Sequence, residues 1–217
     1  SNIHPNSIDI SKATKLTQIE AHNPNLYSVD LSKNKYLRKV DFNGCERLGT
    51  ETATMTLNYC KYLNKVDLRG TQITAVTFNN KGGSLRQIYY PSTLTSLTVK
   101  NQMLLTDLIL PYGNNGEDIA KKLATVEISN CPSIKRVSEI EGENMFAVMK
   151  YCRSLILNNS FNLESMDFNG FTRLQNITLS NIDTLKDIGL NDLCEAGTAS
   201  NLKYVGVSAC LNLKTIN

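Results

Sequence analysis

Large apolar residues recur along this chain at a fixed spacing. A leucine is followed three positions later by Val or Ile and two positions after that by another large apolar residue, as in LYSVDL at 26–31 and LNKVDL at 63–68. The apolar fourth and sixth positions alternate with polar ones, which is the two-residue period of a half-buried β-strand. Asn, Ser, Gly and Pro cluster after the seventh position, as turns require. Each phrase therefore predicts a short strand followed by a turn.

The phrase occurs in two alternating forms. The first residue of each phrase is numbered position 1. From one form, position 1 of the next phrase lies 11 residues further on, or 12 in one case. From the other form this distance varies, and every long insertion falls within it. The true unit is thus a pair, a constant half and a variable half, and about nine pairs fit the chain. The constant halves start at Pro5, Leu26, Thr52, Ile73, Leu94, Leu123, Cys152, Leu174 and Leu202. Pro5, Thr52 and Cys152 match the phrase weakly.

A unit this small cannot bury its own apolar face, so neighbouring units must stack. Burying one Leu or Val side chain fully contributes about 1.5–3 kcal/mol, and stacking repeats this in every half-unit. We expect a single solenoid domain over residues 1–217 with parallel sheets on both sides. Short helices are expected along one edge, at 116–123 and 143–151. Residues 1–2 have the character of an expression scar.

The constant half has the pattern LxxLxLxx(N/C)xxL, which residues 26–37, 123–134 and 202–213 fit throughout. It resembles the leucine-rich repeat family, and the resemblance covers nearly the whole chain. It implies an α/β leucine-rich-repeat solenoid whose constant halves form a concave β-sheet and whose variable halves form a convex one. The strand-like variable half is similar to bacterial LxxLDxSxN repeats of about 21 residues, frequent in surface proteins of gut bacteria. Residues 82–97 are also similar to repeats in phage structural proteins.

The resemblance also implies a role for position 9. In leucine-rich repeats, the side chain at this position points inward and forms hydrogen bonds with backbone groups. Four of the six cysteines occupy this position: Cys45, Cys60, Cys131 and Cys210. Cys152 takes a core position, and Cys194 is the one expected exposed thiol. Other residues at position 9 vary, so a regular asparagine ladder is not expected.

Composition and motifs narrow the class of function. The net charge is +3 with no Lys/Arg block, which argues against nucleic acid as a partner. No apolar run reaches the roughly 20 residues of a membrane helix. No cofactor-binding loop, metal-ligand spacing or catalytic set is present, so we expect no cofactor, no metal and no enzyme activity. Position 5 carries aspartates on both sides of the solenoid, expected to be solvated: Asp30, Asp41, Asp67 and Asp167.

Binding is expected at the insertion edge. The outward positions of the constant halves are mostly small hydroxyl and amide residues, poor in the Trp, Tyr and Arg that dominate protein interfaces. Loops on a rigid scaffold usually carry function. The candidate binding residues are Tyr89, Tyr112, Asn114, Glu117, Lys121, Glu143, Lys150, Asp192 and Glu195.

The sequence thus predicts a non-catalytic module for protein or glycan recognition, or adhesion, at a bacterial cell surface. The alternative is a structural or receptor-binding component of a phage virion or a larger multi-domain assembly. The expected location is extracellular or in the cell envelope, with a signal segment presumed removed. A neighbouring domain or self-association is expected to cover the C-terminal coil, since solenoids need capped ends.

Overall fold

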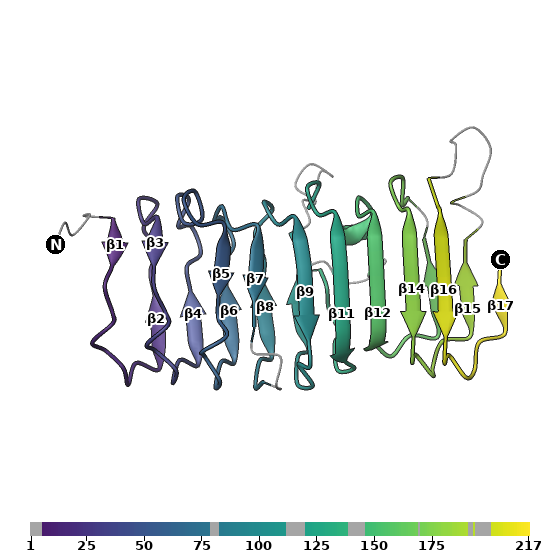
Figure 1. The fold of residues 1–217 in the computed structure, drawn as a ribbon, viewed down its shortest axis with the longest axis horizontal. Coiled ribbons are helices and arrows are strands. Elements are labelled where there is room, and N and C mark those ends of the chain that lie inside the picture. The colour runs from purple at the N-terminus through teal and green to yellow at the C-terminus, as the bar shows by residue number, and fades with distance from the viewer. Residues whose placement is uncertain are drawn as a thin grey trace.

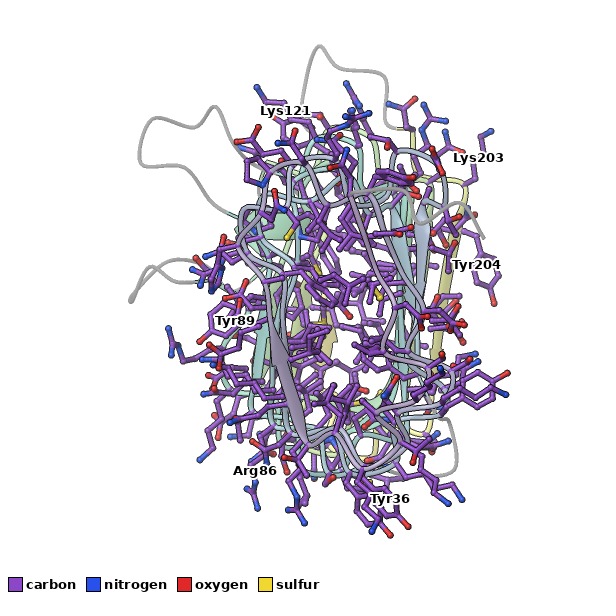
Figure 2. All side chains as sticks on the ribbon, turned by 90° about the vertical axis from the view of Figure 1, so that its left-hand side faces the viewer. Tyr36, Arg86, Tyr89, Lys121, Lys203 and Tyr204 are labelled. Atoms are coloured by element: carbon purple, nitrogen blue, oxygen red, sulfur yellow. The ribbon has the colours of Figure 1, made fainter. Side chains whose placement is uncertain are left out.

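A computed structural model describes residues 6–78, 83–111, 120–138, 146–168, 170–190, 193 and 201–217. Short parallel strands follow one another in a row from the N-terminus to the C-terminus (Figure 1). Viewed along this row, the strands form two walls, and side chains fill the space between them (Figure 2). The predicted parallel sheets on both sides of a solenoid are therefore confirmed.

One wall, which we call the first face, is built by the constant halves. Every strand of this face in the described residues begins at position 3 of a constant half. The strands are β1 (Ser7–Ile8), β3 (Ser28–Val29), β5 (Thr54–Thr56), β7 (Ala75–Thr77), β9 (Ser96–Lys100), β11 (Thr125–Cys131), β12 (Ser154–Ser160), β14 (Asn176–Ser180) and β16 (Tyr204–Ser208). β9, β11, β12, β14 and β16 form one continuous five-stranded sheet.

The opposite wall, the second face, is built by the variable halves. Its strands are β2 (Gln18–Glu20), β4 (Lys39–Asp41), β6 (Lys65–Asp67), β8 (Gln87–Tyr89), β10 (Asp107–Ile109), β13 (Ser165–Asp167), β15 (Asp187–Gly189) and β17 (Thr215–Ile216). One sheet consists of β2, β4, β6, β8 and β10, and another consists of β13, β15 and β17. Between these sheets, Arg136 makes only an isolated bridge to Asp107. The second face is therefore interrupted where the chain leads into the segment 139–145.

The core consists of the apolar columns at positions 1, 4 and 6. Val126 in β11, for example, lies level with Leu97 of β9 and Leu155 of β12, and all three side chains are at most 1% exposed. The strands β9, β11, β12 and β14 of the first face alternate buried and outward residues over their first five positions. The two-residue period read from the sequence thus corresponds to one face on the core and one toward solvent.

A short asparagine ladder closes the ends of β9, β11 and β12, at a position that the sequence interpretation did not consider. Asn101, Asn130, Asn159 and Asn181 all occupy position 8 and adopt positive φ values between 45° and 57°. Asn130 donates from its side-chain amide to Asn101 Oδ1 at 2.9 Å, and Asn159 donates to Asn130 Oδ1 at 3.2 Å. Asparagine tolerates this left-handed conformation better than most residues. The ladder thus lies at position 8, and the expectation that position 9 carries no regular ladder is unaffected. Asn181 departs from the ladder, because its side-chain amide donates to Asn158 Oδ1 at 2.8 Å.

The predicted helices are not confirmed. One 3-10 turn, Ala147–Met149, represents the helix expected over 143–151, and the buried Phe146, Val148 and Met149 hold it against the core. Of the helix expected over 116–123, only 120–123 is described, and it forms a turn. So short a segment gains little from helical hydrogen bonds alone, and apolar packing decides its conformation.

Candidate binding surfaces

The structure does not bring the described candidate residues together. Tyr89, Lys121 and Lys150 are described, whereas Tyr112, Asn114, Glu117, Glu143, Asp192 and Glu195 lie outside the described residues. Tyr89 lies on the second face, and Lys121 lies at the insertion edge (Figure 2). Lys150 follows the 3-10 turn, with its Nζ 5.4 Å from the centre of the Tyr151 ring.

Tyr89 is already engaged within the molecule. The Arg69 guanidinium lies 4.6 Å from the centre of the Tyr89 ring, and Lys65 Nζ lies 5.3 Å from it. Arg69 also holds Asp67 through two parallel N–H donors, and Asp67 is only 3% exposed. The prediction that Asp67 is a solvated strand residue is therefore wrong, because Arg69 covers it. Tyr89 is a weaker candidate for a binding anchor, because these two cations already lie against its ring.

A second surface, which the sequence interpretation missed, lies on the edge opposite the insertions. We call it the basic tyrosine edge and define it by residues in the turns between the first and second faces: Lys15, Lys33, Lys35, Tyr36, Arg38, Tyr59, Lys61 and Tyr62. Figure 2 shows Tyr36 at this edge and Lys121 and Lys203 at the other. Tyr36 and Tyr62 both hold position 11 of successive constant halves, so stacking of the coils places one ring beside the next.

The tyrosines of this edge are exposed, and two of them stack on each other. The rings of Tyr36 and Tyr62 stack with centroids 5.9 Å apart and planes inclined by 10°. Their exposed fractions are 41% and 48%, and that of Tyr59 is 53%. Lys35 Nζ lies 5.1 Å from the centre of the Tyr36 ring, within the range of a cation–π contact.

The edge carries positive charge without compensation. Lys15, Lys33, Lys35, Arg38 and Lys61 are all exposed, and in the part of the chain that the structure describes none forms an ion pair. Two shallow hollows of about 490 and 600 Å³ lie against Tyr36, and no acidic residue lines either. The edge thus offers aromatic surface and cations to a partner, with no carboxylate to be displaced first.

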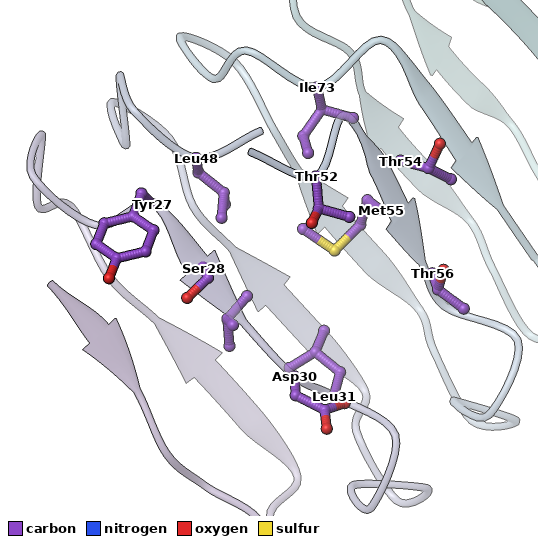
Figure 3. Close-up of a pocket in the computed structure, with 11 residues that line it drawn as sticks. Tyr27, Ser28, Asp30, Leu31, Leu48, Thr52, Thr54, Met55, Thr56 and Ile73 are labelled. Atoms are coloured by element: carbon purple, nitrogen blue, oxygen red, sulfur yellow. The ribbon is translucent and has the colours of Figure 1, made fainter. Parts of the chain in front are cut away.

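A cleft opens in the first face between β3 and β5 (Figure 3). It has a volume of about 210 Å³ and is lined by residues of both strands and of the turn between β4 and β5. Figure 3 shows Leu48 and Met55 between the strand that carries Ser28 and the strand that carries Thr54 and Thr56. Thr52, the weak match at position 1, lies at this cleft and is exposed, whereas Leu26 and Leu94 at the same position are buried.

The cysteines confirm their predicted structural role where they are described. At position 9, Cys45 donates to the Ala21 carbonyl at 3.1 Å and Cys131 to the Ser129 carbonyl at 3.3 Å. Ser160 at the same position donates from its hydroxyl to the Ile128 carbonyl of the preceding coil at 3.0 Å, as Cys45 does to Ala21. Cys152 is fully buried in the core. Cys194 lies outside the described residues.

Thiol titration tests this arrangement. Burial raises the pKa of the Cys60 and Cys131 thiols to about 11 and that of Cys152 to about 12, and it also raises the pKa of Cys45. Since only the thiolate is nucleophilic, these four should react with Ellman's reagent at pH 8 only after unfolding. Cys194→Ser with Cys210→Ser should abolish the fast phase of the native protein. A fast phase that persists in this double variant would contradict the buried arrangement.

The described residues offer no sign of a metal centre or a membrane helix. Within them, no group of three or more His, Cys, Asp or Glu side chains is arranged to hold a metal ion. Among the described segments, no helix has the length and apolar character needed to cross a membrane.

Comparison with known proteins places the chain in a family. No curated protein matches it in sequence. A solved structure from Listeria monocytogenes, "Functional domain of InlJ from Listeria monocytogenes includes a cysteine ladder", is similar, with 15% identity and a TM-score of 0.34 over 97% of this chain. The match covers 48% of that chain, so the present chain spans about half its length. The family described as "Plant disease resistance protein RPS2-like, leucine-rich repeats" matches residues 67–216, more than half of the chain. This match, together with strands that start in phase with the repeated phrase, shows that the chain belongs to the leucine-rich repeat family.

Proposed function

We propose that this protein is a non-catalytic recognition module that binds a protein or glycan ligand through its basic tyrosine edge. Leucine-rich repeat proteins are typically binding modules without enzyme activity. The observation that carries the proposal is the exposed Tyr36–Tyr62 stack among five cations that have no acidic neighbour in the two hollows.

The chemistry of this edge suits recognition. Tyrosine and arginine are enriched among the residues that dominate binding energy, because each gives a large contact area and a polar handle. The Tyr36–Tyr62 stack restrains both rings before binding, which lowers the entropy lost in the complex. The cations attract an acidic partner and raise its association rate. The preferred ligand therefore carries negative charge.

We place the module at a bacterial cell surface, with about nine coils acting as a rigid scaffold. The support for this location is the similarity of its paired repeats to LxxLDxSxN repeats of bacterial surface proteins. A secretion or lipoprotein signal in the full gene would agree with this location. A neighbourhood of tail genes would instead favour the alternative, a component of a phage virion.

Screening the protein on arrays of glycans and extracellular proteins tests the binding surface. We expect Tyr36→Ala with Tyr62→Ala to weaken the strongest interaction at least about tenfold, because each tyrosine is a candidate hot spot. Both rings are exposed, so the melting temperature should stay close to that of the wild type. Raising the salt concentration should also weaken binding.

Two matched variants locate the site. Tyr204→Ala removes a tyrosine that is 55% exposed on the first face and should leave binding intact. Lys121→Glu with Lys150→Glu alters the insertion edge instead. Loss of binding in this lysine pair, with retention in the Tyr36/Tyr62 variant, would move the site to the insertion edge and refute the proposal.

A further inference from the structure

Strand pairing in the first face stops between β3 and β5 and again between β7 and β9. Across the second break the Thr95 N–H still donates to the Thr74 carbonyl at 2.9 Å, whereas no described backbone hydrogen bond crosses the first. Behind the first break, the second face stays paired. β3 pairs only with β1, and β5 pairs only with β7, whereas β4 and β6 pair directly with each other. Figure 1 shows a wider interval between β3 and β5 than between the other neighbouring strands of the first face. The two coils therefore fan apart on one side only.

The chain itself builds this opening. The segment between β4 and β5 places the buried Leu48 beside the cleft, and the Leu48 carbonyl accepts a hydrogen bond from the Gln72 N–H at 2.7 Å. At position 1, the exposed Thr52 replaces the leucine that would draw the coil inward. The buried Leu48 and the absence of a leucine at position 52 thus both contribute to the separation of β3 from β5.

Backbone hydrogen-bonding groups face into the opening from both sides. The Ala53 carbonyl accepts from the N–H groups of Thr74 and Ala75, and the Leu57 N–H donates to the Thr77 carbonyl. Alternate residues of a parallel strand bond to opposite neighbours, so Thr54 and Thr56 direct their N–H and C=O groups away from β7, toward β3. The same alternation turns the backbone groups of Val29 toward β5. No described backbone hydrogen bond joins the two strands.

The lining sets the character of an occupant. Val29, Leu31, Leu48 and Met55 form an apolar floor, and the last three are at most 5% exposed, so little depth remains for an inserted side chain. The outer rim carries hydroxyl groups and one carboxylate, that of Asp30. Inward side chains of an occupant must therefore be small, and outward ones polar or basic.

We propose that this cleft accepts a short extended peptide segment of a partner protein as an added strand between β3 and β5. Strand addition to an exposed sheet edge is a common mode of peptide recognition, in which main-chain bonds give affinity and alternate side chains give specificity. Here two edges face each other, so one segment can bond on both sides. A sugar chain lacks the regular alternation of donors and acceptors that these edges present. The cleft lies on the first face, so this inference goes beyond the binding at the basic tyrosine edge and is independent of it.

The probe is a display library of peptides of about seven residues, enough to span the segment from Tyr27 to Leu31. Alternate positions are restricted to Gly, Ala or Ser, and the others are randomised. The library is selected on the wild-type protein after depletion on the Thr54→Pro variant. Proline removes the one N–H that Thr54 directs into the cleft, and edge strands tolerate proline where the N–H takes no part in the sheet. Thr54→Val keeps that N–H and serves as the matched control.

We expect selected peptides to bind the wild type and the Thr54→Val variant, and to lose about tenfold or more in affinity on Thr54→Pro. Methylation of alternate peptide nitrogens should cause a similar loss, which binding through side chains alone would not. Amide resonances of Val29, Thr54 and Thr56 should shift on binding. If Thr54→Pro fails to fold, Thr52→Phe, which fills the cleft with a ring, replaces it in the depletion and in the affinity comparison.

Three outcomes would overturn the proposal. They are a selection with no enrichment over the depleted library, binding that is insensitive to peptide N-methylation, and resonance shifts confined to other surfaces. Concentration-dependent self-association of the wild type, lost in Thr54→Pro, would identify a second copy as the occupant and would also refute a partner peptide. None of these readouts involves the tyrosine edge, so failure here leaves the proposed function standing.

Discussion

Replacing Val126 with aspartate is expected to abolish the cooperative unfolding transition of the protein. Val126 lies in β11 between Leu97 and Leu155, and it is 1% exposed. An aspartate at this site would lose the apolar contacts of both neighbours and would bury a carboxylate without a partner. The change should cost about 4 kcal/mol or more, which is comparable to the total stability of many domains. Because each coil is held only by its neighbours, failure of a central coil also separates the two halves of the solenoid.

Thermal and urea unfolding followed by circular dichroism measures this loss. Thr125→Asp is the matched control, since Thr125 is the preceding residue of the same strand and its side chain is exposed. This control should change stability by no more than about 0.5 kcal/mol. Equal unfolding midpoints for Val126→Asp and the wild type would show that position 4 does not face the core.

The repeated phrase predicted the positions of the strands well, because the burial of apolar side chains determines the strand register. Position 4 must reach the core in every coil, and a strand register shifted by one residue would expose Val126 and bury Thr125. For this reason even the weak matches Pro5, Thr52 and Cys152 head half-units whose strands begin at position 3. The position 9 cysteines followed from the same register, because position 9 is buried in several described coils, as at Asn34, Cys60 and Cys131.

The breaks in the sheets could not be predicted from the same register. Pairing between coils depends on how each insertion packs, and the phrase carries no information about this. Leu48 belongs to no apolar column, yet it is buried beside the split between β3 and β5. The departure at Thr52 is the one sequence signal at this place, and by itself it indicates only a weak match to the phrase.

The basic tyrosine edge was missed for a different reason. The outward positions 3, 5 and 7 lie on the strands, whereas Tyr36 and Tyr62 lie at position 11, in the turn. Writing the turns in register would have placed the two tyrosines side by side and would have gathered Lys35 and Lys61 at position 10. The lysines are scattered along the sequence and form no block, so charge runs alone could not reveal a surface that stacking assembles.

Replacing Gly49 with alanine is expected to destabilise the protein strongly and to disturb the cleft. Gly49 has a φ of +104°, and a Cβ atom there would lie 2.6 Å from the backbone carbon of Gln72 and from the backbone nitrogen of Ile73. Backbone cannot move aside as a flexible side chain can, so the insertion would have to shift away from the next coil. Strain at this φ and the steric overlap together should cost about 2–5 kcal/mol. The hydrogen bond between Leu48 and Gln72 lies beside the overlap and should weaken with it.

Gly44→Ala separates the two contributions. Gly44 also has a positive φ, +78°, but a Cβ atom there would meet nothing within 4 Å beyond its chain neighbours, so its replacement should cost only the conformational strain, about 1–2 kcal/mol. Differential scanning calorimetry should therefore place the melting temperature of Gly49→Ala clearly below that of Gly44→Ala, with a gap of about 2–4 °C for each kcal/mol of difference. Amide resonances of Thr54 and Thr56 should shift in Gly49→Ala and stay in place in Gly44→Ala, since only the first change lies against the cleft. Equal melting temperatures for the two variants would mean that the backbone of Gln72 does not lie against Gly49, and the separation of β3 from β5 would need another cause.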